Sequence, residues 1–333
     1  MKHIVIAGFH GALATPITGV MDILSLTGVS WQRIMDEPPE PRFKVWLASA
    51  DGLAIKCINH LEIGVQMSFA QVMNSAELKE NLFAIFVPTI GSPIEVTLAQ
   101  NPEMLEFLRW GHQHNRVIAG NCTGNFFLAE AGLLNAKSAT THWGYKTLFE
   151  ARYPEVQLKA DQLITVDDNL FCAGGGLAWF DLAIYMIEKE FGYDWALQTS
   201  KAFVIDYRRE SQLSYSLSRM AQNHTDALVA KIQCYFEDHY HQNQELEDVA
   251  AKFNISKRTL IRRFKAAMNM TPYAYLQQTR IEVSQKLLAE TQLTPEQVVN
   301  NVGYEDISSF RRLFKQTTGL TLAEYRQRYA RRL

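Results

Sequence analysis

The sequence predicts an α/β domain followed by an all-α domain with two helix-turn-helix units. Short apolar runs alternate with helical patterns over about the first 192 residues, and a helical unit is repeated near the end of the chain. The charge is divided in the same way. Residues 252–333 contain 15 Lys or Arg against 6 Asp or Glu, whereas the whole chain of 333 residues has a net charge of −2. This asymmetry predicts a basic module for a polyanion, joined to a domain with a different task.

The N-terminal part is predicted to form a mostly parallel sheet flanked by helices. The expected strands are 3–8, 43–49, 82–88, 116–120, 163–166 and 170–174. Helical patterns occupy 102–114, 124–133 and 177–191. Ligands bind such sheets at the carboxyl ends of the strands, so we look for a site there.

Cys122 lies at one of these strand ends, in the stretch "RVIAGNCTGNFFLAEAGLL". An apolar run stops at Gly120 and a helical pattern starts after Thr123 and Gly124, which predicts a tight strand-to-helix turn. Catalytic nucleophiles occupy such turns, and a helix N-terminus favours the thiolate. Cys122 is therefore a candidate nucleophile, a candidate redox-sensing thiol, or a residue that lines a ligand site.

Composition excludes several other classes of protein. The 47% hydrophobic and 20% charged residues are those of a globular domain, and no apolar run approaches the roughly 18 residues of a membrane span. The start of the chain lacks a signal-peptide pattern. The four cysteines have no paired spacing, and we expect a cytoplasmic protein with reduced thiols, no cofactor, no metal site and no membrane partner.

The C-terminal part repeats itself at an offset of fifty residues. "LIRRFKAAMNMTPYAY" (260–275) matches "FRRLFKQTTGLTLAEY" (310–325). Each copy is predicted to be helix, turn and helix, with units at about 245–268 and 294–318. Ser256 and Asp306 are the expected N-caps of the second helices. A long amphipathic helix between the copies would join them rigidly.

The second helix of each unit is predicted to present a basic face. At 100° per residue, Leu260 and Phe264 lie opposite that face in the first unit, and Phe310 and Phe314 in the second. The positions on the basic faces are Arg258, Ile261, Arg262 and Lys265 in the first unit and Ser308, Arg311, Arg312 and Lys315 in the second. A solvated charged face would explain one such helix, but duplication at matched positions favours a pair of recognition helices for the DNA major groove.

These motifs resemble the DNA-binding domain of the AraC/XylS family. The matching residues are "LEDVAAKFNISKRTLIRRFK" and "VGYEDISSFRRLFKQTTGLTLAEYR". Leu322 departs from the family, which has a proline there, and we expect little effect. The resemblance implies two recognition helices about 34 Å apart on one face of double-stranded DNA. It implies base contacts by Arg258, Ile261 and Arg262, and by Ile307, Ser308, Arg311 and Arg312.

The first domain resembles the ThiJ/PfpI branch of the class I glutamine-amidotransferase-like fold. The resemblance rests on "GNCTGNFFLAEAGLLNAKSATTHW" and "FCAGGGLAWFDLAIYMIEKEFG". In enzymatic relatives a histidine follows the cysteine, and His142 stands in that place. Relatives with a reactive cysteine have an acidic residue where this chain has Pro16, so the partner of the sulfur is missing. The resemblance implies a ligand site formed by Cys122, Thr123, His142, Trp143 and Gly175.

The expected organisation is a ligand-sensing domain over 1–192, a connector over 193–225 and a DNA-binding domain over 226–333. The apolar start of the connector is expected to fold against the first domain, and 216–226 to be its flexible part. Asp226 is expected to begin the first helix of the DNA-binding domain.

The whole pattern resembles bacterial transcription regulators that join these two domains. The resemblance implies control by a small, nitrogen-containing metabolite, a homodimer, and activation through RNA polymerase. The alternative is a cysteine-dependent hydrolase or amidase with Cys122 and His142 as catalytic residues, or a thiol-based redox sensor. We expect no enzymatic activity.

Overall fold

The computed structural model describes residues 1–206, 211–212 and 224–330. The chain divides into two compact units, Met1–Gln212 and Leu213–Leu333, and each is described by itself. No helix in the described part of the chain is long and apolar enough to cross a membrane.

The first unit contains a seven-stranded sheet with the order β10-β11-β7-β6-β1-β2-β5, in which only the β10–β11 pairing is antiparallel. The strands of this sheet are β1 (Lys2–Ala7), β2 (Phe43–Ser49), β5 (Met67–Ser68), β6 (Leu82–Val87), β7 (Val117–Asn121), β10 (Ile164–Asp167) and β11 (Leu170–Ala173). Two small sheets pair β3 (Ile55–Lys56) with β4 (Glu62–Ile63) and β8 (Ser138–Ala139) with β9 (Gln157–Leu158). The six predicted strands are all present, which confirms the predicted fold class.

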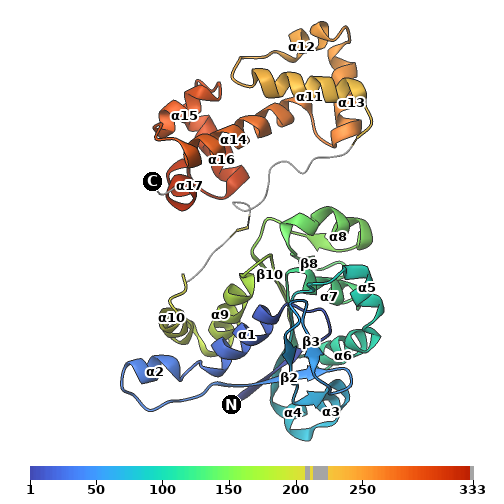
Figure 1. Ribbon diagram of the computed structural model, residues 1–333, viewed down its shortest axis with the longest axis vertical. Coiled ribbons are helices and arrows are strands. Elements are labelled where there is room, and N and C mark those ends of the chain that lie inside the picture. The colour runs from blue at the N-terminus through green and yellow to red at the C-terminus, as the bar shows by residue number, and fades with distance from the viewer. Residues whose placement is uncertain (207–210, 213–223, 331–333) are drawn as a thin grey trace. The chain divides into compact units, whose positions relative to one another are not determined.

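Helices cover both faces of the sheet (Figure 1). The helices are α1 (Ala14–Ser25), α2 (Ser30–Ile34), α3 (Phe69–Asn74), α4 (Ala76–Asn81), α5 (Ile94–Ala99), α6 (Pro102–Gln113), α7 (Asn125–Glu130), α8 (Lys146–Arg152), α9 (Ala178–Phe191) and α10 (Tyr193–Ala202). Two 3-10 turns, Cys122–Gly124 and Trp143–Tyr145, complete the unit. Helices α1 and α9 pack on one face, and α6 and α7 on the other.

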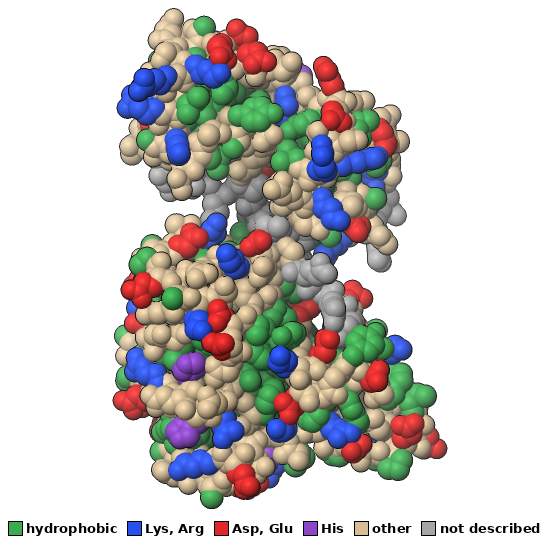
Figure 2. Space-filling model, turned by 180° about the vertical axis from the view of Figure 1, so that it is seen from behind, with side chains coloured by type: hydrophobic (Ala, Val, Ile, Leu, Met, Phe, Trp, Pro, Cys, Tyr) green, Lys and Arg blue, Asp and Glu red, His purple; other side chains and the backbone are tan. Residues whose placement is uncertain are grey.

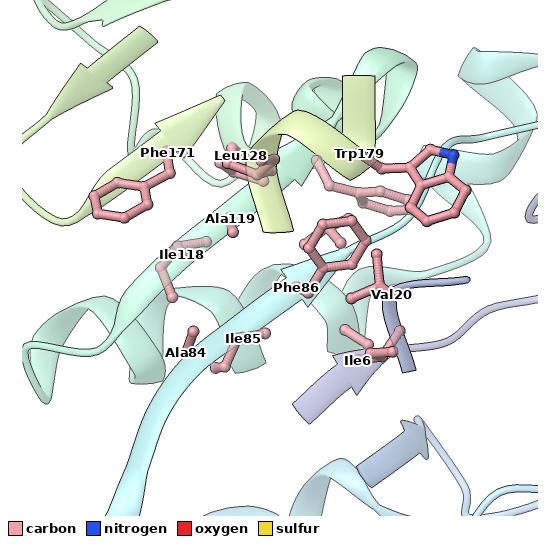
Figure 3. Close-up of a cluster of buried hydrophobic side chains, with 14 of the residues drawn as sticks. Ile6, Val20, Ala84, Ile85, Phe86, Ile118, Ala119, Leu128, Phe171 and Trp179 are labelled. Carbon is pink, nitrogen blue, oxygen red and sulfur yellow. The ribbon is translucent and has the colours of Figure 1, made fainter. Parts of the chain in front are cut away.

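The core of this unit forms on both sides of the central strands. Phe86 of β6 lies near Val20 of α1 and Trp179 of α9, while Leu128 belongs to α7 (Figure 3). All four are buried, with 2% exposure or less. Continuous apolar runs such as "LFAIFV" form these strands because a parallel sheet is covered on both faces. The central strands therefore hold their carboxyl ends in fixed positions.

The first compact unit extends beyond residue 192, where the sequence placed the domain boundary. Helix α10 packs against α9 and α2, and Ser211 and Gln212 contact the same unit. Of the segment 216–226 that we expected to be flexible, 216–223 lie outside the described residues.

The second unit consists of helices, in agreement with the predicted fold class. They are α11 (Ala227–His239), α12 (Leu246–Lys252), α13 (Lys257–Met268), α14 (Pro272–Glu290), α15 (Pro295–Asn301), α16 (Ile307–Thr318) and α17 (Leu322–Tyr329). The expected caps are present: Ser256 accepts from Thr259 N, and Asp306 accepts from Ser308 N and Ser309 N. Helix α17 begins at Leu322 without the family's proline, because Thr321 caps it through a capping box.

The long helix α14 belongs to two separate cores. Its first half places Tyr275 and Leu276 in the core that contains Phe264, and its second half places Ile281 and Leu288 in the core that contains Phe314. The long helix that the sequence predicts between the two copies is present. Each helix-turn-helix therefore has its own core on a shared helix.

Candidate functional site

The two second helices place their predicted apolar and basic residues on opposite sides. Leu260, Phe264, Phe310 and Phe314 are 1% exposed or less. The exposed side chains are Arg258, Arg262 and Lys265 on α13 and Ser308, Arg311, Arg312 and Lys315 on α16. Lys and Arg side chains are visible over both halves of this unit in Figure 2. The burial pattern thus agrees with the helical wheel at these positions.

The basic face of α13 is open to a partner. Among the described residues, Arg258, Arg262 and Lys265 form no side-chain hydrogen bond or ion pair. A surface hollow is lined by Lys257, Arg258, Ile261 and Arg262. These guanidinium groups keep their donors available for phosphate or for base edges.

The face of α16 is partly engaged within the protein. Arg311 Nη2 lies 2.6 Å from Glu296 Oε1 of α15, and Arg312 donates to Ser309 Oγ at 3.3 Å. Ile307, which we expected to contact bases, packs in part against the core of its own unit. The Arg311 guanidinium is therefore held to α15 through Nη2, in an ion pair that is about half exposed.

Arg263 lies beside Arg262 but is not among the predicted DNA contacts. Its guanidinium binds both carboxylate oxygens of Asp226, at 2.8 and 2.7 Å. The hydrogen bonds from Arg263 hold the pKa of the Asp226 carboxyl below its usual value. Asp226 also caps α11 by accepting from Leu228 N and Val229 N. Arg263 therefore holds two helices together and is turned away from the open face.

Cys122 in the first unit occupies the predicted turn between β7 and α7. Its φ is +57°, a left-handed conformation that is rare for a residue with a Cβ atom. The side chain is buried, with 6% exposure. Thr123 is also buried, and its hydroxyl donates to Ile90 O at 2.8 Å. The turn after β7 is thus bound to the segment that follows β6.

Burial decides the ionisation of Cys122. It raises the pKa of the thiol, and the nearby polar groups of Thr123, Gly176 and Thr89 offset this only in part. The expected preference for the thiolate is therefore wrong. Helix α7 has only 6 residues, and desolvation of the sulfur outweighs the groups that favour its charge.

His142 is not arranged as a base for Cys122. Its Nδ1 accepts a hydrogen bond from Gly144 N at 2.9 Å, and no hydrogen bond joins it to Cys122 in the described residues. Burial lowers the pKa of the imidazole, which favours its neutral form. The ring packs on Gly175, where a Cβ atom would come within 2.2 Å of His142 Cδ2. The first turn of α1, which contains Pro16, has no acidic residue.

The five predicted ligand residues belong to three segments, which we call together the elbow site: Cys122, Thr123, His142, Trp143 and Gly175. Hydrogen bonds connect these segments at the ends of β7 and β11. The Thr141 hydroxyl donates to Cys122 O at 2.9 Å, and Asn125 Nδ2 donates to Thr140 O and Ala173 O at 2.9 Å each. The sequence did not predict the roles of Thr141 and Asn125, because their hydrogen-bond partners lie 15 to 48 positions away along the chain.

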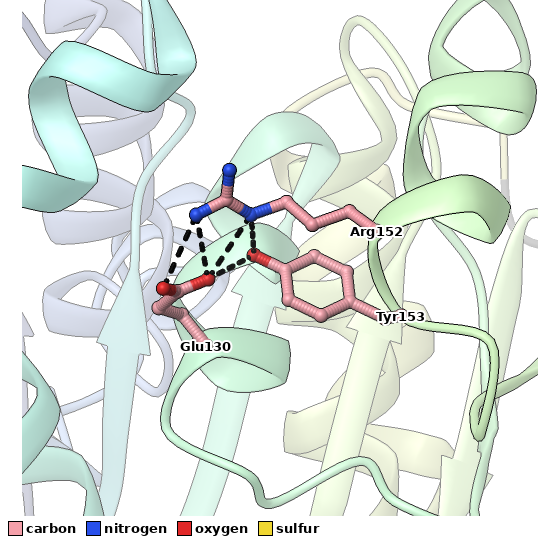
Figure 4. Close-up of polar contacts among 3 residues, drawn as sticks. All are labelled: Glu130, Arg152 and Tyr153. Carbon is pink, nitrogen blue, oxygen red and sulfur yellow. Dashed lines mark hydrogen bonds and ion pairs between the residues drawn. The ribbon is translucent and has the colours of Figure 1, made fainter.

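An ion-paired cluster fixes helix α8, which follows the His142 segment (Figure 4). Arg152 Nη2 donates to both Glu130 oxygens at 3.2 and 3.1 Å, and its Nε donates to Tyr153 Oη at 2.9 Å. The Tyr153 hydroxyl donates to Glu130 Oε2 at 2.5 Å. Burial and the Glu130 carboxylate raise the pKa of Tyr153. The cluster links the C-terminal ends of α7 and α8.

No group of three or more His, Cys, Asp or Glu among the described residues could hold a metal ion. Cys57 and Cys172 are buried free thiols, and Cys234 is exposed. The chemistry available at the elbow site therefore consists of one buried thiol and the surrounding polar groups.

Comparison with known proteins agrees with both domains. The model of the DJ-1/PfpI family matches residues 30–189, and a helix-turn-helix domain model matches residues 249–328. DJ-1beta of Drosophila melanogaster covers 62% of this chain and 99% of its own, with 20% identity and a TM-score of 0.51, which concerns the fold alone.

Similar curated proteins include two bacterial regulators. The HTH-type transcriptional regulator GbdR of Pseudomonas aeruginosa is 25% identical over 227 residues, which are 68% of this chain and 61% of that protein. The HTH-type transcriptional regulator GlxA of Rhizobium meliloti is 24% identical over 282 residues, 82% of this chain and 80% of that protein. The match with GbdR thus leaves more than a third of that relative uncovered. The chain itself joins a domain of the DJ-1/PfpI family to a helix-turn-helix domain of the AraC type.

Proposed function

We propose that the chain is a bacterial transcription regulator that binds double-stranded DNA through α13 and α16. The observation that carries this proposal is the pair of exposed basic faces, each opposite buried side chains that include Phe264 in α13 and Phe314 in α16. Arg262 and Arg312 occupy equivalent positions, fifty residues apart. Two such faces, on two helices that the long helix α14 joins, suit adjacent segments of a major groove. Similarity to GbdR and GlxA supports the same function.

Charge reversal tests the DNA interface. Arg262→Glu and Arg312→Glu each place a carboxylate where phosphate or guanine would bind, so each should weaken binding to a selected promoter fragment by tenfold or more, since one such contact contributes about 1–3 kcal/mol. Lys286→Glu, an equal change of charge at an exposed position of α14, is the control. Equal affinity of all four proteins, measured by fluorescence anisotropy, would reject these helices as the interface.

The elbow site is proposed to bind a small-molecule effector, with a nitrogen-containing metabolite as the expected class. It follows strand ends, where sheets of this kind bind ligands. A thermal-shift screen of metabolites on the full chain tests the proposal, because a ligand of the folded state raises its melting temperature. A hit that still stabilises a Trp143→Ala, His142→Ala double variant to the same extent binds elsewhere.

A regulatory role is favoured over catalysis at Cys122. The thiol is buried with a raised pKa, the His142 Nδ1 atom is occupied by Gly144, and an acidic partner is missing from the first turn of α1. By the resemblance, we infer a homodimer that activates transcription through RNA polymerase in the cytoplasm. Two linked modules would raise affinity for paired half-sites.

A further inference from the structure

Gln212 is the last residue of the first compact unit, and its side chain is buried, with 2% exposure. Its Oε1 atom accepts hydrogen bonds from Gly175 N at 3.0 Å and Trp143 N at 3.4 Å. Its Nε2 atom donates to Thr141 O at 2.7 Å and to Ala160 O at 2.8 Å. Every donor and acceptor of the carboxamide is thus matched to a backbone group.

The surroundings of Gln212 are specific for a primary carboxamide. Donors lie on one side and acceptors on the other, so a carboxylate would face the carbonyl oxygens and an ammonium would face the two amides. The fit is close, because a Cβ atom at Gly174 would come within 2.8 Å of the Gln212 side chain. Burial of so many polar groups is stable only while all of them are paired.

The backbone beside this side chain is docked as well. Gln212 N donates to Asp161 O at 3.1 Å, and Ser211 Oγ donates to the same oxygen at 3.0 Å. Ser211 also forms an antiparallel bridge with Gln162. The chain is therefore held to the first unit immediately before it continues toward the helix-turn-helix unit.

Two short paths connect Gln212 to Cys122. The carbonyl of Thr141 binds Gln212, while the hydroxyl of the same residue donates to Cys122 O. The Gly175 amide binds Gln212, and the next residue, Gly176, lies beside the buried sulfur of Cys122. A molecule that displaces either segment of the elbow site must therefore disturb the hydrogen bonds of Gln212.

We propose that the Gln212 carboxamide is an intramolecular ligand that ties the end of the first compact unit to the elbow site, and that effector binding there changes this attachment and thereby DNA affinity. The proposal rests on the proposed function for its second half. The first half, the docking itself, is independent of DNA and of any effector.

Hydrogen–deuterium exchange of the full chain tests the docking. Gln212→Ala removes the acceptor of the Trp143 and Gly175 amides, so their exchange should become about tenfold faster. Gln157→Ala deletes an exposed carboxamide that donates to Ala136 O and serves as the matched control. Unchanged exchange of both amides in Gln212→Ala overturns the proposal.

Chemical rescue distinguishes lost docking from general misfolding. Acetamide carries the same functional group and should restore slow exchange to Gln212→Ala, whereas N,N-dimethylacetamide, which has no N–H donor, should not. Equal effects of the two amides, or no effect of either, overturn a site specific for a carboxamide.

Fluorescence anisotropy with the selected promoter fragment tests whether the attachment of Gln212 changes DNA affinity. Gln212→Ala should change the affinity of the full chain by at least about fivefold relative to Gln157→Ala, the lower range of allosteric coupling. Faster exchange with unchanged DNA affinity overturns the regulatory role and leaves the docking. If the native chain binds no genomic fragment, the proposed function fails, and the exchange result still decides the docking.

Discussion

Cys122 combines a position typical of nucleophiles with surroundings that keep its thiol neutral. The left-handed backbone and the strand-to-helix turn follow from its place after β7. The ionisation, however, depends on the side chains that bury the sulfur, and these come from distant parts of the sequence. A residue pattern can therefore identify the turn without deciding the reactivity of the residue in it.

Alkylation measures that reactivity directly. At pH 8, iodoacetamide should modify Cys122 at least about tenfold more slowly than exposed Cys234, because the thiolate is the reactive form and the raised pKa keeps it scarce. The rate at Cys122 should still be rising at pH 9, since burial raises the pKa of its thiol above the ordinary value of a cysteine. Peptide mass spectrometry separates the four cysteines. Faster labelling of Cys122 than of Cys234 would favour the redox or catalytic alternative.

Arg262 and Arg263 are neighbours with opposite expected roles. Arg262→Ala should weaken DNA binding by about 1–3 kcal/mol and leave folding intact, because its side chain contacts no described partner. Arg263→Ala should lower the free energy of unfolding relative to the native chain, because it breaks the paired hydrogen bonds to Asp226, which are partly exposed. Urea denaturation and anisotropy of both variants check the assignment. A loss of stability in Arg262→Ala but not in Arg263→Ala would contradict the roles assigned to the two residues.

Glu130 links helix α7 to helix α8 by binding Arg152 and Tyr153. Glu130→Gln keeps the shape of the side chain but removes the charge that binds Arg152 and Tyr153, so the free energy of unfolding should fall by about 1–2 kcal/mol. Glu155→Gln, an exposed site in the same unit, should be neutral within about 0.5 kcal/mol. Urea denaturation followed by tryptophan fluorescence compares them, and equal stability of the two variants would contradict a structural role for the cluster.

The affinity of the whole chain for DNA should fall strongly as the salt concentration rises. Each phosphate contact adds about −0.9 to the slope of log K against log salt concentration. Lys315→Gln should therefore reduce the magnitude of that slope by about 1, and Lys286→Gln should leave it unchanged. Anisotropy titrations at several salt concentrations give both slopes. A slope near zero for the native chain would mean that few phosphates are bound.

Sequence periodicity predicted most of the architecture, because strands with continuous apolar runs and helices with a buried stripe repeat at fixed intervals. It also predicted the caps Ser256 and Asp306, whose side chains act on neighbouring amides. It missed the contacts that depend on tertiary position. Arg280 is an example: it is buried in α14 and donates to Tyr240 O and Gln242 O at 2.8 Å each. Gln212 is another, since nothing local marks a glutamine whose partners lie 37 to 72 positions away.

The shared helix α14 sets the rotation of one helix-turn-helix unit relative to the other. Its 19 residues correspond to a helix length of about 28 Å. Each added residue would turn the second helix-turn-helix unit by about 100° relative to the first. One alanine inserted in α14 would thus turn the two helix-turn-helix units toward different sides of a duplex, although every side chain proposed to contact DNA would be unchanged. The length of α14 therefore matches the distance between the two DNA segments that the units bind, and a change in that distance during evolution would require a change in the length of the helix.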